Sequence, residues 1–336
     1  MRGALSRAQR HALHADIRAL HEAIRAAVSA LLNEAARAGR PELANAPTQW
    51  GAGDLGYRLD EVAEAALDDF GTRVGARHPL VLVAEGPGVR RYGASASGPP
   101  LRAIIDPVDG TRSLMHELRS AWALTGVAPD RGADTHLSDL EVCVQTELPV
   151  STAGRYRVLS WQLDDPAQHA LHDVSTGAAL QQGELRVSPE LPLDNGYLCF
   201  TRYLPVERSL VAALEHDVLD ALIAAHDLSP RLLYDDNYLC SAGQLFLVST
   251  GRYRLLADLR GWLRATRGLP NFTAKPYDLA CLPIYRAAGV PVLDAQAQPL
   301  DAPLDTETPL DVLAFGNERL REVFEPLVFA AMQRLA

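Results

Sequence analysis

The most informative stretch of the sequence is Leu101-Arg-Ala-Ile-Ile-Asp-Pro-Val-Asp-Gly-Thr111. Its first five residues are largely apolar and predict a short buried strand that ends at Asp106. The carboxylates of Asp106 and Asp109, three residues apart, are then expected in one tight acidic turn. Pro107 restricts one backbone angle of this turn, and Gly110 permits a backbone conformation that other residues avoid.

Such a turn can direct three oxygen atoms at one point, because the carbonyl of Val108 lies between the two carboxylates in sequence. Carboxylate and carbonyl oxygens are the hard ligands that Mg²⁺ prefers. The alternative interpretation is structural: Asp109 and Thr111 would act as N-caps of a helix over residues 112–120. The turn alone does not decide between the two.

A second acidic residue also follows an apolar stretch. Residues 79–84, Pro-Leu-Val-Leu-Val-Ala, predict a buried strand that stops at Glu85-Gly-Pro-Gly88. If this strand is parallel and adjacent to the strand before Asp106, the side chains of Glu85 and Asp106 lie at one edge of a sheet. A single glutamate at a strand end is commonly only solvated, but this combination of acids favours a cation site.

The remaining pattern alternates between helices and strands and predicts an α/β protein. Apolar residues at three- and four-residue spacing predict a long amphipathic helix over residues 5–39, and a second helix begins near Asp60. Further strands are predicted at 121–128, 140–147, 155–162, 184–188, 197–201, 231–234 and 253–257. Further helices are predicted at 206–226, 240–251, 278–288 and 317–335. Loops are predicted at 47–53, 89–100 and 163–182.

Composition narrows the classes of function. The net charge is −10 and no block of Lys and Arg occurs, so we expect no nucleic-acid polymer as a partner. There is no run of about 18 apolar residues and no signal-like apolar start, which predicts a cytoplasmic enzyme without membrane contact.

The cysteines are far apart in sequence and are expected to be buried thiols; they are Cys143, Cys199, Cys240 and Cys281. On the first predicted helix we expect solvated histidines rather than metal ligands at His11, His14 and His21.

Taken in order, the acidic residues resemble the motifs of the inositol monophosphatase superfamily. These Mg²⁺-dependent, lithium-sensitive phosphatases include fructose-1,6-bisphosphatases and histidinol-phosphatase-like enzymes. The strand-end Glu of the superfamily is matched by Glu85, and its Asp-Pro-hydrophobe-Asp-Gly-Thr signature by residues 106–111. An upstream Asp-Leu-x-x-x-x-Asp element is matched from Asp54 to Asp60, and the late Asp that opens a helix by Asp278.

The resemblance implies a centre of two to three Mg²⁺ ions. Glu85, Asp106 and the Val108 carbonyl would hold the first ion. Asp106, Asp109 and Asp278 would hold the second, and a third, weaker ion would use Glu85 through water. Paired ions about 4 Å apart neutralise a phosphate ester and lower the pKa of water, so losing one ligand carboxylate should be near-fatal.

The resemblance also implies catalytic and substrate-binding roles. Asp60 and Thr111 would orient and deprotonate the attacking water beside Glu85. The amides of Gly110 and Thr111 would hold the phosphate. Lys275, in a Lys-Pro-Tyr-Asp segment similar to histidinol-phosphatase-like members, would contact the substrate.

Several positions depart from the superfamily pattern and leave inositol specificity open. Gly86 replaces a second acid after the strand-end Glu, Gln49 replaces a Lys, and Gly56-Tyr57 replaces Val-Thr. Asn271 stands where inositol-specific members have an acid that binds a sugar hydroxyl, and we expect it to contact the substrate.

The resemblance implies a layered αβαβα sandwich with an N-terminal metal-binding half, 1–185, and a C-terminal α/β half, 186–336. The active site would lie between them, and the protein would form a homodimer. The implied reaction is hydrolysis of a small phosphate monoester (a sugar, cyclitol or amino-alcohol phosphate) by metal-activated water. Two alternatives stay open. One is a nucleotide 3′-phosphatase or fructose-1,6-bisphosphatase, with a second phosphate bound by Arg252, Arg254 or Lys275. The other is a non-catalytic metal-binding relative, against which the water-activating pair argues.

Overall fold

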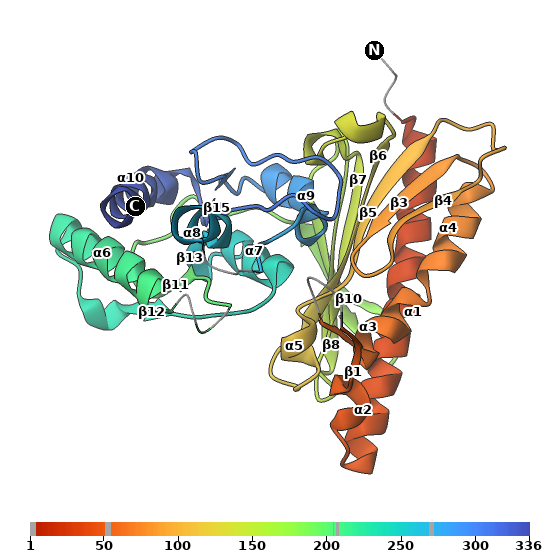
Figure 1. Ribbon diagram of the computed structural model, residues 1–336, viewed down its shortest axis with the longest axis horizontal. Coiled ribbons are helices and arrows are strands. Elements are labelled where there is room, and N and C mark those ends of the chain that lie inside the picture. The colour runs from red at the N-terminus through yellow and green to blue at the C-terminus, as the bar shows by residue number, and fades with distance from the viewer. Residues whose placement is uncertain (1–4, 51–54, 204, 206–207, 269–271) are drawn as a thin grey trace. The chain divides into compact units, whose positions relative to one another are not determined.

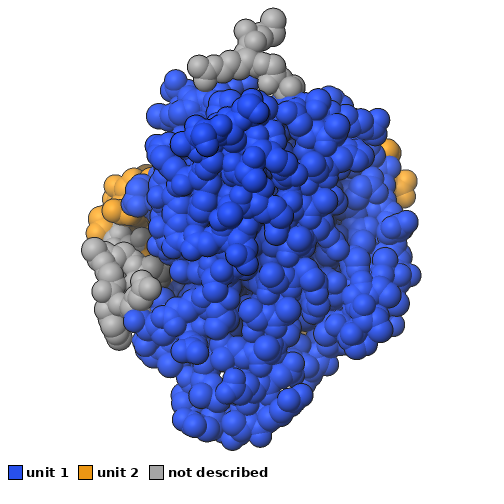
Figure 2. Space-filling model, turned by 90° about the vertical axis from the view of Figure 1, so that its right-hand side faces the viewer, with its two compact units in different colours: residues 1–185, 275–284, 302–308 blue, residues 186–274, 285–301, 309–336 orange. Residues whose placement is uncertain are grey.

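A computed structural model of the protein describes residues 5–50, 55–203, 205, 208–268 and 272–336. The chain divides into two compact units, which are coloured separately in Figure 2. The first unit consists of residues 1–185, 275–284 and 302–308, and the second of residues 186–274, 285–301 and 309–336. Two short segments from late in the sequence therefore belong to the first unit.

The first unit is built on an eight-stranded mixed sheet in the order β10-β9-β8-β7-β6-β5-β3-β4. Only the β3–β5 pair is parallel among these neighbours, and the other pairs are antiparallel. The strands are β3 (Leu80–Ala84), β4 (Gly88–Tyr92), β5 (Leu101–Asp109), β6 (Ala121–Pro129), β7 (Val142–Leu148), β8 (Arg155–Gln162), β9 (Gln168–Asp173) and β10 (Ala179–Glu184). A separate hairpin pairs β1 (Pro47–Trp50) with β2 (Leu55–Tyr57).

Helices cover one face of this sheet. Figure 1 shows α1 and α4 on the same side of it, and α1 packs against β6 and β7. The helices and 3₁₀ turns of the first unit are α1 (Arg7–Ala38), α2 (Glu42–Asn45), α3 (Arg58–Glu64), α4 (Leu67–Gly75), α5 (Thr111–Leu114), η1 (Gly132–Asp134), η2 (Leu137–Asp139) and η5 (Pro276–Leu279). The 3₁₀ turn η5 packs against β5 and β6.

Helix α1 confirms the long amphipathic helix predicted from the apolar spacing. Ser6 caps its N-terminus in a capping box with Gln9, and Gly39 ends it in the left-handed conformation, with φ of 62°. Its apolar stripe is almost fully buried against the sheet, as at Ile17 and Ile24. The helix is therefore held by tertiary packing along its whole length.

His21 on α1 is buried, so the prediction of a solvated histidine is wrong at this position. Its side chain is 0% exposed. Nδ1 lies 3.0 Å from the Thr146 hydroxyl and Nε2 lies 2.9 Å from the Thr125 hydroxyl. Because both ring nitrogens find partners on β6 and β7, the imidazole is accommodated in the core in its neutral form.

The second unit has a five-stranded mixed sheet in the order β12-β11-β13-β15-β14. Its strands are β11 (Gly196–Phe200), β12 (Leu233–Asp235), β13 (Tyr253–Asp258), β14 (Val292–Leu293) and β15 (Val312–Phe315). Its helices and 3₁₀ turn are α6 (Arg208–His226), η4 (Pro230–Leu232), α7 (Ser241–Ser249), α8 (Arg260–Arg267) and α10 (Glu318–Leu335). Helix α9 (Leu282–Ala287) contains residues of both units. The core of the second unit brings buried residues of the sheet, such as Phe315, together with α6 and α10.

The predicted α/β class is confirmed, since two mixed sheets are flanked by helices. Several local predictions are wrong. The loops predicted at 47–53, 89–100 and 163–182 contain residues of strands β1, β4, β9 and β10, and the strand predicted at 184–188 is absent. Strand β10, Ala-Leu-Gln-Gln-Gly-Glu, lies at a sheet edge with mostly exposed side chains, so no apolar alternation marks it. Backbone pairing with β9 defines that strand.

All four cysteines are buried free thiols, as predicted. Among the described residues, no helix combines the length and the apolar character that crossing a membrane requires.

Candidate active site

The site is built on the ends of strands β3 and β5. These strands are parallel neighbours, and Ala84 pairs with Ile105 in their register. The next residues, Glu85 and Asp106, therefore lie side by side at the point where β3 ends, as expected for adjacent parallel strands. The amide of Glu85 donates to the carbonyl of Ile105 at 3.1 Å, which continues the pairing by one step.

The acidic turn is a bulged extension of β5, which corrects the prediction of a simple turn. Against β6, Asp106 pairs with Leu124 and Asp109 pairs with Trp122. Three steps along β5 thus match two steps along β6, which inserts one extra residue into the strand. Pro107 has no amide hydrogen to donate, so an interruption of the ladder is expected here. A bulge of this kind bends the strand locally and increases its twist.

The capped-helix alternative does not match the structure. Helix α5 contains only four residues, Thr111–Leu114, so the helix predicted over residues 112–120 is wrong. Its cap residue is Gly110, which adopts a left-handed conformation with φ of 100° and makes no side-chain cap. Neither Asp109 nor Thr111 is the N-cap, and Gly110 is required by the backbone conformation.

Three aspartates converge in the first unit. One carboxylate oxygen each of Asp106, Asp109 and Asp278 lies within 4.8 Å of the others. Asp106 is 1% exposed and Asp109 is 6% exposed. Asp278 comes from η5, a late segment of the sequence that is part of the first unit. The cluster that the sequence assigned to two halves of the chain is therefore contained in one compact unit.

Asp106 is the most deeply buried of these carboxylates. Its Oδ1 accepts a hydrogen bond from the Val108 amide at 2.9 Å. Its Oδ2 is buried and receives no hydrogen bond from any described residue. Burial first, and then the negative charges of Glu85, Asp109 and Asp278, raise the pKa of Asp106 well above its usual range.

This donor set fits a hard divalent cation. An ionised carboxylate that is buried without a donor is costly, and surrounding acids increase the cost. A cation bound by the three oxygens would stabilise the buried negative charge and would offset the repulsion between the acids. An all-oxygen set of carboxylates is the chemistry that Mg²⁺ requires. The arrangement is therefore a possible metal site.

Asp60 and Thr111 meet as the resemblance implied, although 51 residues separate them in sequence. The hydroxyl of Thr111 lies 2.7 Å from Oδ1 of Asp60 and 2.9 Å from the carbonyl of Val108, so it can donate to either. The other oxygen of Asp60 accepts from the Tyr57 amide at 2.9 Å. Asp60 is thus oriented by the first turn of α3 while it faces the Thr111 hydroxyl.

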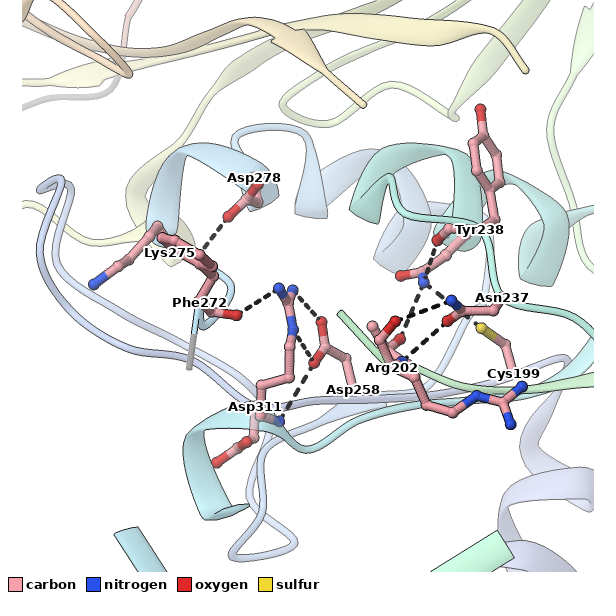
Figure 3. A network of polar contacts seen from close by, with 12 residues as sticks. Cys199, Arg202, Asn237, Tyr238, Asp258, Phe272, Lys275, Asp278 and Asp311 are labelled. Atoms are coloured by element: carbon pink, nitrogen blue, oxygen red, sulfur yellow. Dashed lines mark hydrogen bonds and ion pairs between the residues drawn. The ribbon is translucent and has the colours of Figure 1, made fainter. Parts of the chain in front are cut away.

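Lys275 and Asp278 are linked through the backbone. The amide of Lys275 donates to Oδ2 of Asp278 at 2.6 Å, which orients that carboxylate. Figure 3 shows the Lys275 side chain pointing away from Asp278, and its ammonium donates to the carbonyl of Glu307. Asn271, the other expected substrate contact, lies outside the described residues, as does Asp54 of the upstream motif.

Arg254 does not supply the second-phosphate contact that the bisphosphate alternative suggested. It is 5% exposed. Its guanidinium donates to backbone carbonyls, namely those of Pro192, Asp194, Asn195 and Gly251. The residue instead links the segment that leads into β11 to the turn that precedes β13.

One acidic residue near these elements was missed by sequence reasoning. Glu64 is the last residue of α3 and follows Asp60 by four positions, which places both on one side of the helix. Burial and the charge of Asp60 raise the pKa of Glu64 to about 7. The four-residue spacing was the available signal.

Comparison with known proteins gives a consistent result at the level of the fold. No protein-family model and no curated protein sequence matches the chain. The fructose-1,6-bisphosphatase of Leishmania major matches with a TM-score of 0.65 over 95% of each chain, at 12% identity. Inositol monophosphatase II of Staphylococcus aureus matches with a TM-score of 0.59, 13% identity, and coverage of 96% of this chain and 97% of its own. The IMPase of Thermotoga maritima matches with a TM-score of 0.57 and 15% identity, and the match covers 94% of this chain and 97% of its own. The chain therefore has the fold of the inositol monophosphatase superfamily, as its motifs predicted.

Proposed function

We propose that this protein is a Mg²⁺-dependent phosphatase that hydrolyses a small phosphate monoester. The observation that carries the proposal is the buried cluster of Asp106, Asp109 and Asp278, in which one oxygen of Asp106 receives no hydrogen bond. The same unit holds the Asp60–Thr111 pair, which a protein that only stores a metal does not need. Together they favour catalysis over the non-catalytic alternative.

The proposed reaction assigns a task to each residue. Glu85, Asp106, Asp109, Asp278 and the Val108 carbonyl would hold the ions. When bound, Mg²⁺ supplies positive charge that neutralises the phosphate and lowers the pKa of water.

The chain itself supplies orientation and proton transfer. The Thr111 hydroxyl, held 2.7 Å from Oδ1 of Asp60, would accept a hydrogen bond from the attacking water while it donates to Asp60. Asp60 would then receive the proton through that hydroxyl. The amides of Gly110 and Thr111 would bind phosphate oxygens, because the left-handed Gly110 turns the chain at the strand end.

The substrate class that we propose is a sugar, cyclitol or amino-alcohol phosphate. The matching structures are named as fructose-1,6-bisphosphatases and inositol monophosphatases, which act on small phosphoesters. By the same resemblance we propose two to three Mg²⁺ ions, substrate contacts from Asn271 and Lys275, and a cytoplasmic homodimer. Light scattering coupled to size-exclusion chromatography measures the oligomeric state directly.

The central test is phosphate release from a panel of esters with and without Mg²⁺, for the wild type and Asp109→Asn. The panel contains inositol 1-phosphate, histidinol phosphate, fructose 1,6-bisphosphate and 3′-phosphoadenosine 5′-phosphate. We expect release that requires Mg²⁺ and disappears in the variant, because Asp109 is part of the buried cluster. Release that is independent of Mg²⁺, or that survives in Asp109→Asn, would contradict the proposal. The preferred ester distinguishes a monophosphatase from the nucleotide and bisphosphate alternatives.

Thr111 provides a second prediction. Thr111→Ala should lower kcat by about 10²- to 10⁴-fold, the usual contribution of positioned proton transfer, with little effect on Mg²⁺ binding. Thr111→Ser keeps the hydroxyl and should retain most of the activity. Steady-state kinetics at saturating Mg²⁺ and calorimetry measure the two effects. If Thr111→Ala and Thr111→Ser were equally active, the hydroxyl would have no role in the reaction.

A further inference from the structure

Helix α3 brings another carboxylate to the turn that follows β3. A Cβ placed on Gly86 would lie 2.2 Å from Oε1 of Glu64 and 3.0 Å from its Cδ. The distance of 2.2 Å is too short for a contact of a Cβ, so the Glu64 carboxylate would have to move if residue 86 had a side chain. The carboxylate of Glu64 therefore occupies the space that a side chain of residue 86 would need.

Gly86 is required at this position for two reasons. Its φ of 77° is in the left-handed region, where a residue with a side chain is strained. In addition, only a residue without a side chain lets the Glu64 carboxylate approach the main chain beside Glu85. The absence of a side chain at Gly86 thus leaves room for an acidic group from α3 at the turn that follows β3.

Glu64 has no hydrogen-bond or ion-pair partner within the described part of the chain. The charges that act on it are those of Asp60, Arg90 and Glu61. Of these, Arg90 already donates to Asp68 at 2.8 Å. A half-buried carboxylate without a partner, close to other acids, is a group that a cation would stabilise.

An independent observation points to a cation at the adjoining strand end. The Oδ2 atom of Asp106 is buried without a hydrogen-bond donor. Glu85 lies beside Asp106 at the edge formed by β3 and β5. Gly86 directly follows Glu85, so the Glu64 carboxylate lies at the turn that adjoins this edge.

We infer that Glu64 is a further carboxylate of the Mg²⁺ centre. It extends from α3 past Gly86, which has no side chain, on the Glu85 side of the centre, and it strengthens cation binding. This inference rests on the proposed function. Mg²⁺ keeps several of its waters in proteins, and carboxylates outside the direct ligand set orient such waters. Glu64 acts in this way, as a positioning residue on the Glu85 side of the centre.

The test compares Glu64→Gln with Glu61→Gln in the full chain. Glu64→Gln keeps the size and removes the charge, whereas Glu61 is exposed on the same helix and provides the matched control. Titration calorimetry with Mg²⁺ should show affinity about 10- to 100-fold weaker in Glu64→Gln, the usual effect of removing an outer carboxylate. The Mg²⁺ concentration for half-maximal phosphate release should rise in parallel with the loss of affinity. Glu61→Gln should resemble the wild type.

Two further variants separate a charge effect from a folding effect. Glu64→Asp keeps the charge and should bind Mg²⁺ more tightly than Glu64→Gln. Gly86→Ala should weaken Mg²⁺ binding because its Cβ displaces the Glu64 carboxylate, and it should add no further weakening in a Glu64→Gln background. Melting curves identify any variant that is unfolded.

The outcomes distinguish this inference from the proposed function. If the wild type binds Mg²⁺ and Glu64→Gln binds it equally well, the inference is wrong and the proposed function stands. Equal weakening by Glu61→Gln would also overturn it, because the effect would be one of general charge. If the wild type binds no Mg²⁺, both are wrong.

Discussion

Asp106→Asn should abolish Mg²⁺-dependent phosphate release and, at the same time, stabilise the metal-free protein. Metal stabilisation of the transition state is worth several kcal/mol, so we expect a loss of about 10³-fold or more. Asparagine keeps the acceptor for the Val108 amide but removes a buried charge whose other oxygen has no donor. The variant therefore loses catalytic activity. It is also more stable without metal, because the neighbouring acids no longer repel a charge at position 106.

The pH dependence of this stabilisation has a definite sign. The folded state raises the pKa of Asp106 above its ordinary value of 3.8. A group of this kind contributes its full stability below the unfolded pKa and loses it as the pH rises through the folded pKa. In EDTA, the melting temperature of Asp106→Asn should therefore exceed that of the wild type at pH 8, and the difference should shrink toward pH 4.

Melting curves in EDTA and in Mg²⁺ test this prediction. A stabilisation of 1 kcal/mol corresponds to about 2–4 °C in a domain of about 150–250 residues. Mg²⁺ should raise the melting temperature of the wild type more than that of Asp106→Asn. Asp69→Asn, an exposed position on α4, is the control and should change neither property. A variant that melts below the wild type in EDTA at pH 8 would show that the acidic cluster is not under repulsion.

His21 should make the folded protein sensitive to acid. Burial lowers the pKa of His21 from 6.5 to about 3. Between these values the unfolded chain binds a proton that the folded chain excludes, so stability is present above pH 6.5 and is lost as the pH falls. At pH 4.5 the loss from this residue should be about 2.5 kcal/mol relative to pH 7, since each pKa unit corresponds to 1.36 kcal/mol.

Urea denaturation at pH 7 and pH 4.5 measures this loss. His21→Gln cannot be protonated and can still bond to the hydroxyls of Thr125 and Thr146, so its stability should fall less between the two pH values. His11→Gln, on the exposed side of the same helix, should fall as much as the wild type. If His21→Gln and the wild type lost equal stability, the imidazole would not be the source of the acid sensitivity.

The sequence was most informative where local chemistry and backbone geometry coincide. The apolar runs before Glu85 and Asp106 predicted two buried strands, and the structure shows these strands as parallel neighbours in which Ala84 pairs with Ile105. The Asp-Pro-Val-Asp-Gly-Thr stretch identified the residues that converge, and Gly110 adopts the unusual conformation expected of it. The superfamily fold followed from the order of these motifs, although no family model matches the chain.

Features that depend on contacts between distant residues were decided only by the tertiary structure. Asp278 is far from Asp106 in sequence, yet η5 packs on β5 and places both carboxylates in one unit. His21 resembles any polar residue on a helix until its two threonine partners are known. Strand β10 has mostly exposed residues and no apolar alternation, and it is defined by its pairing with β9.

The sequence by itself determined the class of fold, the acidic motifs and the chemistry that they can support. It did so because a buried strand is recognisable as a run of apolar residues, and because proline and glycine restrict or permit particular backbone conformations. Only the tertiary structure decided the bulge that extends β5, the burial of His21 and the position of Glu64 over Gly86. The physical reason is that each of these features depends on which atoms of a distant segment pack beside it. The residues adjacent in sequence do not determine which segment that is.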